Sequence, residues 1–129
     1  MDNTLSNIIV PMLKKLKEQK HGAPYVDDSD TPEHLHSTKD PKYDPNRPED
    51  TDEFFFKRWD FVMDEMIWAF EQKLGDEDWS EQYYEWDVDK REMFGIKMIS
   101  HDKKGYENHH KRMQNGFRLF GKYYCSLWD

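Results

Sequence analysis

The fold is decided by residues 103–128, whose sequence is KKGYENHHKRMQNGFRLFGKYYCSLW. Large, mostly aromatic side chains recur in this stretch at spacings of three and four: Tyr106, His110, Met113, Phe117, Phe120, Tyr124 and Leu127. This spacing predicts one long amphipathic helix over 103–128, capped at its start by Asp102. Because a single helix cannot bury such a stripe on its own, we expect it to dock against a second apolar helix.

A matching helix is predicted over residues 52–74, where large apolar side chains follow the same rhythm: Phe56, Trp59, Met63, Met66 and Phe70. A second set widens its apolar face: Phe55, Val62, Ile67 and Leu74. Thr51 or Asp52 is suited to cap its start, and Gly75 is suited to end it. Since this helix is apolar on more than one side, we expect it to be central and antiparallel to the helix over 103–128.

Residues 4–20 are predicted to form a third helix, with six apolar residues on one side: Leu5, Ile8, Ile9, Met12, Leu13 and Leu16. Asn3 or Thr4 is suited to cap this helix, and Gly22 to end it. Pro11 removes one backbone donor, so we expect either a kink or a first turn that starts later.

Two further segments complete the expected fold. Residues 23–51 contain five of the six prolines and no sustained apolar periodicity, so they predict an irregular acidic loop, either disordered or laid against a surface. Alternating apolar residues around Lys90 and Arg91 predict a small β-hairpin over 82–99. The expected fold is mainly α: residues 1–129 form a single three-helix bundle-like domain with this hairpin and a long acidic proline-rich loop.

The net charge is −8, and it is unevenly distributed along the chain. Residues 23–53 and 54–94 are strongly acidic, whereas 1–22 and 95–129 are basic. One interpretation is that basic helices pack beside an acidic one with complementary rims. The other is an acidic face directed at a basic partner. No apolar run approaches the roughly twenty residues that cross a membrane, and the single cysteine, Cys125, excludes an internal disulfide framework.

Three strings carry a resemblance: HGAPYVDDSDTPEHLHST, FKRWDFVMDEMIWAFEQ and NGFRLFGKYYCSLWD. Together they resemble a group of small bacteriophage-encoded proteins of unknown function, over most of the chain from about Asp2 to Asp129. Members often carry a short extra segment before the position of Met1, which implies a missing N-terminal strand or an alternative start. The resemblance implies a viral origin and a location in the bacterial host cytoplasm or in the virion. It implies no activity and no catalytic residues.

The motifs that could carry chemistry are weak. Glu107 with His110, and Glu33 with His36, form two E-x-x-H pairs, but the second pair lies in the proline-rich loop rather than on a helix as in di-iron bundles. Asp27, Asp28 and Asp30 lack the glycine and terminal glutamate of an EF-hand loop. We therefore expect no metal, cofactor or catalytic site.

Other charged residues on the helices have simpler interpretations than catalysis or nucleic-acid binding. Asp60 and Asp64 lie one turn apart and are expected to face Arg112 or Arg118, or water. Basic residues over 103–128 are interleaved with tyrosines, but the overall negative charge argues against nucleic-acid binding.

Two glycines interrupt the predicted helix over 103–128. Gly116 and Gly121 each cost roughly 1 kcal/mol relative to alanine in a helix. We expect a neighbouring backbone or ring, such as a tryptophan of the helix over 52–74, to approach closely there. The alternative is a kink that opens a binding surface.

Taken together, the sequence predicts a non-enzymatic phage accessory protein that binds a host or defence protein with a basic surface. Six acidic residues are candidates for that contact: Asp27, Asp28, Asp30, Glu49, Asp50 and Asp52. The alternative is a virion structural or assembly protein that forms a homo-oligomer through surplus aromatic residues: Trp79, Tyr83, Tyr84, Trp86 and Trp128. A metal-binding or enzymatic helical protein is the third possibility.

Overall fold

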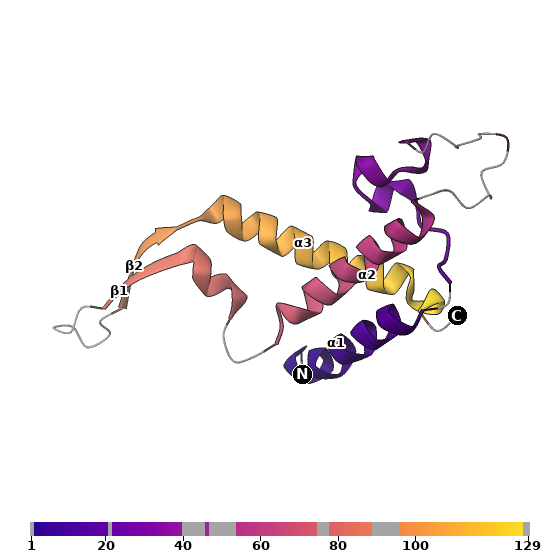
Figure 1. Ribbon diagram of the computed structural model, residues 1–129. Coiled ribbons are helices and arrows are strands. Elements are labelled where there is room, and N and C mark those ends of the chain that lie inside the picture. Colours follow the sequence, from indigo (N-terminus) through magenta and orange to yellow (C-terminus); the bar gives the residue numbers. More distant parts are fainter. Residues whose placement is uncertain are drawn as a thin grey trace.

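The computed structural model describes residues 2–20, 22–39, 46, 54–74, 78–88 and 96–127, and the chain is mainly helical (Figure 1). The long helices are α1 (Asp2–Gln19), α2 (Phe55–Glu71) and α3 (Lys103–Lys122). Two strands, β1 (Tyr84–Val88) and β2 (Ile96–His101), form an antiparallel pair. Short 3-10 helices are η1 (Asp28–Asp30), η2 (Glu33–Leu35), η3 (Ser37–Lys39), η4 (Trp79–Tyr83) and η5 (Tyr124–Ser126).

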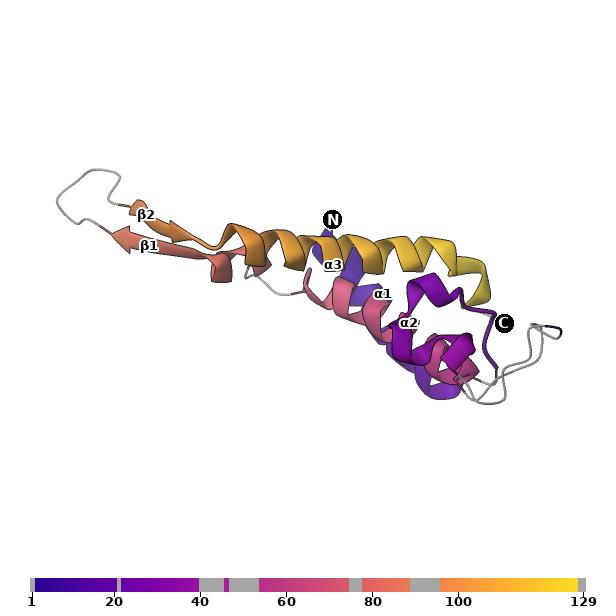
Figure 2. The same ribbon diagram turned by 90° about the horizontal axis from the view of Figure 1, so that it is seen from above.

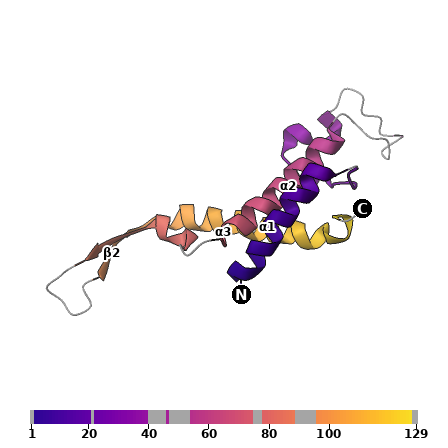
Figure 3. The same cartoon turned by 60° about the horizontal axis from the view of Figure 1, so that its bottom comes forward.

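Helix α2 is central because it packs against both α1 and α3 (Figures 1 and 3). Its contacts with α3 run from Trp59 against Tyr123 at one end to Trp68 against His109 at the other. The residue numbers rise along one helix as they fall along the other, so α2 and α3 are antiparallel, as predicted. The pairs Lys20–Asp60 and Lys17–Asp64 show the same opposite direction for α1 and α2.

The hydrophobic core lies mainly along α2, whose predicted residues Trp59, Met63 and Met66 are all buried. Phe56, in contrast, is half exposed and lies outside the core. Helix α2 begins at Phe55 and ends at Glu71, so it is shorter than the range 52–74 predicted for it. The expected caps Thr51, Asp52 and Gly75 lie outside the described residues.

The buried face of α3 differs from the predicted stripe. Met113, Gly116 and Leu119 are buried within α3, followed by Tyr123 and Leu127, whereas His110 and Tyr124 are exposed. The reason is Gly116, where an added Cβ would lie 2.4 Å from the Ala69 Cβ and 2.7 Å from the Glu65 carbonyl oxygen. The smallest residues of the two helices therefore meet, and the bulky rings are displaced to the flank.

The flanking rings of α3 still contribute to packing. Phe117 and Phe120 each meet Phe70 edge-on, with ring centroids 5.0 Å apart. The expected close approach to Gly116 is therefore correct, but the neighbour is the α2 backbone with Ala69 and not a tryptophan. No atom of a surrounding element approaches Gly121 in the described structure, so the same expectation is wrong there.

The start of α3 agrees with the prediction, whereas its end does not. The Asp102 side chain accepts a hydrogen bond from the Gly105 N–H at 3.0 Å, which confirms the predicted cap. The helix ends at Lys122 rather than 128, because Tyr123 leaves the helical conformation and the chain continues as η5.

Helix α1 begins at Asp2, before the predicted caps, and it ends at Gln19. Its buried residues are Ser6, Val10 and Leu13, so the predicted apolar face is rotated. Leu5, Ile8 and Met12 are 49%, 56% and 40% exposed, respectively. Pro11 lies inside the helix on its exposed side, where water can satisfy the carbonyl that loses its N–H partner.

Residues 22–39 do not form a solvated loop: they pack on the helices. Val26 is 1% exposed and belongs to the core, whereas Tyr25 is exposed and Leu35 is half-buried. The helices η1–η3 lie beside the N-terminal end of α2 (Figure 1). Residues 40–45 and 47–53, where the prediction continued the acidic loop, lie outside the described structure.

The strands β1 and β2 form a narrow arm that projects from the helical body in line with α3 (Figure 2). Their register pairs Tyr84 with His101, Trp86 with Met98, and Val88 with Ile96, with an irregularity between Glu85 and Trp86. The predicted turn around Lys90 and Arg91 lies outside the described residues. Helix η4 connects this arm to the side of α3.

Replacement of Gly116 by alanine should destabilise the protein, because the new methyl group would collide with Ala69 and the α2 backbone. Overpacking of this kind lowers the free energy of unfolding by about 1–3 kcal/mol. Gly121→Ala is the matched control in the same helix and should be neutral or stabilising by up to about 1 kcal/mol. Urea denaturation measures both variants, and equal effects would contradict the close helix contact.

Candidate partner-binding site

Asp30, a predicted partner-binding acid, is buried at a junction between η1 and the end of α3. Its carboxylate accepts hydrogen bonds from Arg118 at 2.7 Å, Lys122 at 2.6 Å and the Tyr123 hydroxyl at 2.7 Å. Asp27 pairs with the same Lys122 at 2.6 Å, and its N–H donates to the Tyr123 hydroxyl at 3.2 Å. These contacts join residues 22–39 to α3.

The pKa values at this junction follow from its geometry. Burial alone would raise the pKa of Asp30, but the hydrogen bonds from Lys122, Tyr123 and Arg118 lower it to about 2. Hydrogen bonds to Asp27 and Asp30 raise the pKa of Lys122. Burial and the hydrogen bond to Asp30 raise the pKa of Tyr123. Asp30 therefore stays ionised at neutral pH and acts as a structural counter-ion.

Asp28 also makes internal contacts. Its carboxylate accepts hydrogen bonds from the Ser37 N–H at 3.0 Å and the Ser37 hydroxyl at 2.7 Å. Arg58, which is buried, lies 3.8 Å from the same carboxylate and donates to the Leu35 carbonyl. This part of the predicted loop is therefore laid against the helices, which is the second of the two expected arrangements. The other predicted acids, Glu49, Asp50 and Asp52, lie outside the described residues.

Ion pairs along the helices account for much of the remaining charge. The α1 lysines pair with α2: Lys14 with Glu71 at 3.7 Å, Lys17 with Asp64 at 2.5 Å, and Lys20 with Asp60 at 2.7 Å. Arg112 of α3 pairs with Glu65 at 3.0 Å. Asp60 and Asp64 thus face α1 and not Arg112 or Arg118. These ion pairs fit the first interpretation of the charge distribution, in which basic helices pack beside an acidic one.

An aromatic stack holds η4 against the first half of α3. The Trp79 ring lies nearly parallel to His109, with centroids 4.6 Å apart, and to Tyr106, with centroids 5.0 Å apart. Trp68 of α2 approaches His109 at 5.0 Å. We call Trp68, Trp79, Tyr83, Tyr106 and His109 the aromatic stack.

Both ring nitrogens of His109 are hydrogen-bonded. Nδ1 lies 2.6 Å from the Tyr83 hydroxyl, and Nε2 lies 3.0 Å from Oε1 of Gln72. An amide oxygen can only accept, so Nε2 carries the proton and the Tyr83 hydroxyl donates to Nδ1. Burial, and secondly the charge of Arg112, lower the pKa of His109. His109 is thus a neutral connector between α2, α3 and η4.

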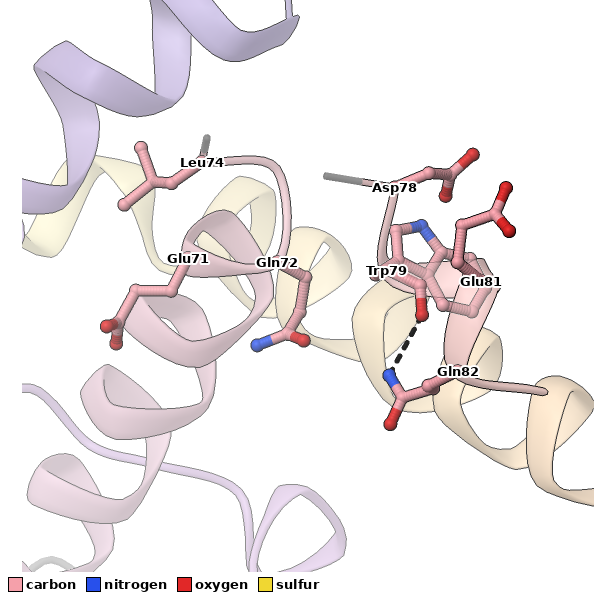
Figure 4. A pocket seen from close by; sticks show the side chains of 7 residues that line it. All are labelled: Glu71, Gln72, Leu74, Asp78, Trp79, Glu81 and Gln82. Carbon is pink, nitrogen blue, oxygen red and sulfur yellow. Dashed lines mark hydrogen bonds between the residues drawn. The ribbon is translucent and has the colours of Figure 1, made fainter. Parts of the chain in front are cut away.

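Beside the aromatic stack is an open cleft of about 870 Å³, which we call the η4 cleft (Figure 4). Its lining comes from the end of α2 and from η4: Glu71, Gln72, Leu74, Asp78, Trp79, Glu81 and Gln82. Three carboxylates, two amides and an indole thus surround one space. Asp78 accepts from the Ser80 N–H and hydroxyl, and these bonds lower its pKa, so the carboxylate is fixed and ionised.

The sequence around this cleft is unusually acidic. Of the fourteen residues from Asp76 to Asp89, seven are acidic and none is Lys, Arg or His. This run, with Trp79 near its start, is the signal that could have identified the cleft. The acidic residues predicted to contact a partner lie instead in residues 27–52, and they do not include Glu71, Gln72 or Gln82.

The predicted aromatic candidates fall in different places. Trp79 lies in the aromatic stack, and Tyr84 stacks on His101 across the strands at 4.2 Å. Trp86 lies in β1, opposite Met98, and Trp128 lies outside the described residues. Trp79 is therefore the predicted candidate that the structure brings into the cleft.

The two E-x-x-H pairs lie in separate parts of the fold. Glu33 pairs with Lys39 at 3.2 Å, and His36 contacts the Thr31 carbonyl at 3.1 Å, both within η1–η3. Glu107 and His110 are exposed on α3. Within the described residues, no three His, Cys, Asp or Glu side chains gather closely enough to hold a metal ion.

Among the described residues, no helix has the length and apolar character needed to span a membrane. Comparison of the chain with protein-family models, curated proteins and solved structures finds no match.

Acidification should reveal the internal role of Asp30. The folded protein holds the pKa of Asp30 at about 2, below its ordinary value of 3.8, so the unfolded chain binds the proton first. The resulting stability, up to about 2 kcal/mol, is present above about pH 4 and is lost as the pH falls through 2. Urea midpoints from pH 5 to pH 2 should therefore fall more steeply for wild type than for Asp30→Asn. Parallel curves would show that Asp30 gains nothing from its partners.

Proposed function

We propose that this chain is a small, non-enzymatic protein that binds a basic protein partner through an acidic surface centred on the η4 cleft. The observation that carries the proposal is that the described acidic residues fall into two groups, one bound within the fold and one lining the cleft. Asp27, Asp28 and Asp30 are bound by other side chains of the fold, whereas Asp78 and Glu81 line an open cleft. These two residues belong to a stretch of sequence, Asp76 to Asp89, that holds seven acidic residues and no basic one. A field of one sign accelerates the encounter with a surface of the opposite sign.

The aromatic stack supports binding rather than catalysis. His109 is the histidine of the aromatic stack beside the cleft, but Tyr83 and Gln72 occupy both of its ring nitrogens. A general base needs a free nitrogen within reach of the proton that it removes. The stack instead gives the cleft a rigid wall.

The resemblance to small phage-encoded proteins supports a biological setting for this proposal. A phage accessory protein would meet its partner, a host or defence protein, in the host cytoplasm. Proteins that act on nucleic acid commonly present basic grooves, which an acidic surface complements.

A second candidate function is virion assembly through self-association. The exposed residues Leu5, Ile8 and Met12 are spaced to lie on one side of α1. Next to Leu5 is a groove of about 280 Å³, partly lined by Phe70 and Phe117. A contiguous exposed apolar surface of this kind is typical of protein contacts.

Neutralising the cleft should slow association with a partner captured from infected host cells. Asp78→Asn/Glu81→Gln should lower the on-rate at low salt, and the difference from wild type should shrink as salt rises, because exposed charges are screened within about 8 Å at physiological ionic strength. Glu18→Gln/Glu33→Gln removes the same charge elsewhere on the surface and is the control. Identical on-rates for all three proteins at every salt concentration would contradict the proposal.

The assembly alternative makes a different prediction. If α1 mediates self-association, native mass spectrometry should show oligomers in wild type that dissociate in Ile8→Glu. Asn7→Glu changes an exposed position of the same helix outside the apolar stripe and should leave the oligomers intact. A wild-type monomer at all accessible concentrations would exclude this alternative.

A further inference from the structure

We infer that the η4 cleft binds the guanidinium group of an arginine side chain from the partner, laid flat on the indole of Trp79 and paired with Asp78. This inference rests on the proposed function and names the chemical group that the acidic surface recognises. Arg112 already occupies an arginine site of the same kind within the described chain.

The internal site consists of an indole face and a carboxylate on one side of α2. The Arg112 guanidinium lies 3.9 Å from the centroid of Trp68. Its Nε and one terminal nitrogen donate to the two carboxylate oxygens of Glu65, at 3.0 and 3.2 Å. Stacking on the ring and a two-pronged ion pair are the two contacts that a planar guanidinium makes best.

The η4 cleft presents the same two parts without an arginine. Trp79 stacks on Tyr106 and His109 of α3 and also lines the cleft, so its indole lies between the aromatic stack and the cleft (Figure 4). Asp78 directly precedes it in the chain. Both bonds from Ser80 go to Oδ1 of Asp78, and Oδ2 accepts no hydrogen bond from any described residue.

Cations of the described chain do not fill this position. Among the described residues, no Lys or Arg forms an ion pair with Asp78 or lies over the ring of Trp79. Lys73 acts on Asp78 only through its longer-range charge. The nearest arginine, Arg112, is already held by Trp68 and Glu65.

The other polar groups of the cleft also favour a positively charged donor. The amide nitrogens of Gln72 and Gln82 are used within the chain, by the Trp68 and Trp79 carbonyls at 3.0 and 2.8 Å. Among the described lining residues, Asp78 keeps one carboxylate oxygen that no described donor engages, so the cleft presents an acceptor and negative charge. A ligand must therefore donate hydrogen bonds and carry positive charge.

The size of the cleft selects among such ligands. A metal ion is disfavoured, because no three described carboxylates lie close enough together to hold one. A volume of about 870 Å³ exceeds one guanidinium and fits a short peptide segment with an arginine anchor. Guanidinium is preferred to ammonium because it is flat, is more weakly hydrated and presents several donors in one plane.

The test uses the full-length protein and three synthetic peptides, acetyl-Gly-Ser-Xaa-Ser-Gly-amide, with Xaa as arginine, lysine or citrulline. Citrulline keeps the shape of arginine but is neutral. The readout is the set of tryptophan indole N–H signals in ¹H–¹⁵N NMR spectra, with Trp79 assigned by its loss in Trp79→Phe. The arginine peptide should shift the Trp79 signal in a saturable, salt-sensitive manner and leave Trp68 unshifted.

Two variants locate the binding. Asp78→Asn should weaken the arginine peptide roughly tenfold, as expected for the loss of one charge-assisted hydrogen bond. Glu18→Gln, which removes an exposed charge from α1, should leave the affinity unchanged. Trp79→Leu keeps an apolar side chain over His109 and should abolish binding. If Trp79→Leu fails to fold by circular dichroism, the Asp78→Asn comparison decides.

Three results would overturn the inference: no shift at Trp79, equal binding of the citrulline peptide, or equal affinity for lysine and arginine. The captured partner separates this inference from the proposed function. Salt-dependent association that survives Asp78→Asn and Trp79→Leu would keep the acidic surface and reject the arginine site. Peptide binding at Trp79 combined with salt-independent partner association would reject the proposed function and keep the arginine site.

Discussion

The contact between Gly116 and Ala69 is the constraint on which the rest of the structure depends. Because neither residue has a side chain beyond Cβ, α3 approaches the α2 backbone closely at this point. The residues one and two turns away on the same faces then meet in pairs. Arg112 reaches Glu65 and Trp68, and His109 reaches Trp68 and Gln72. Beyond Gly116 in the other direction, Leu119 enters the core and Tyr123 meets Trp59. A single small-residue contact therefore sets both the core and the aromatic stack.

The sequence predicted the helices well, but it predicted their faces poorly. The spacing of Trp59, Met63 and Met66 correctly identified the buried side of α2, because its partner on each side is another helix. Helix α3 is different: its apolar residues cover a wide arc, and periodicity alone favoured the stripe with the largest rings. Gly116 has no side chain to register in such a pattern, yet it marks the closest approach. The same ambiguity rotated the expected face of α1, where Ser6 is buried and Ile8 is exposed.

The candidate site was harder to predict than the fold, because charge counts do not say which charges are already paired. The sequence shows Asp27, Asp28 and Asp30 only as a cluster of acids. The partners of Asp27 and Asp30 lie far along the chain, at the end of α3. A buried carboxylate with three donors, such as Asp30, is recognisable only once residues 30, 118, 122 and 123 are placed together. Trp79 was predicted because the chain has a surplus of aromatic residues. Its neighbours in the cleft could not be predicted, because they depend on how η4 lies beside the end of α2.

The distribution of packing suggests why acidity is retained around η4. A two-stranded hairpin is only marginally stable alone, and like charges along one segment repel each other. The segment is nevertheless held to α3 by the stacking of Trp79 on Tyr106 and His109 and by the hydrogen bond from Tyr83 to His109. Aromatic contacts on one side of η4, together with the Asp78 cap on Ser80, thus stabilise the segment. Like charges close together in a chain repel each other, so a partner of opposite charge would relieve such repulsion on binding.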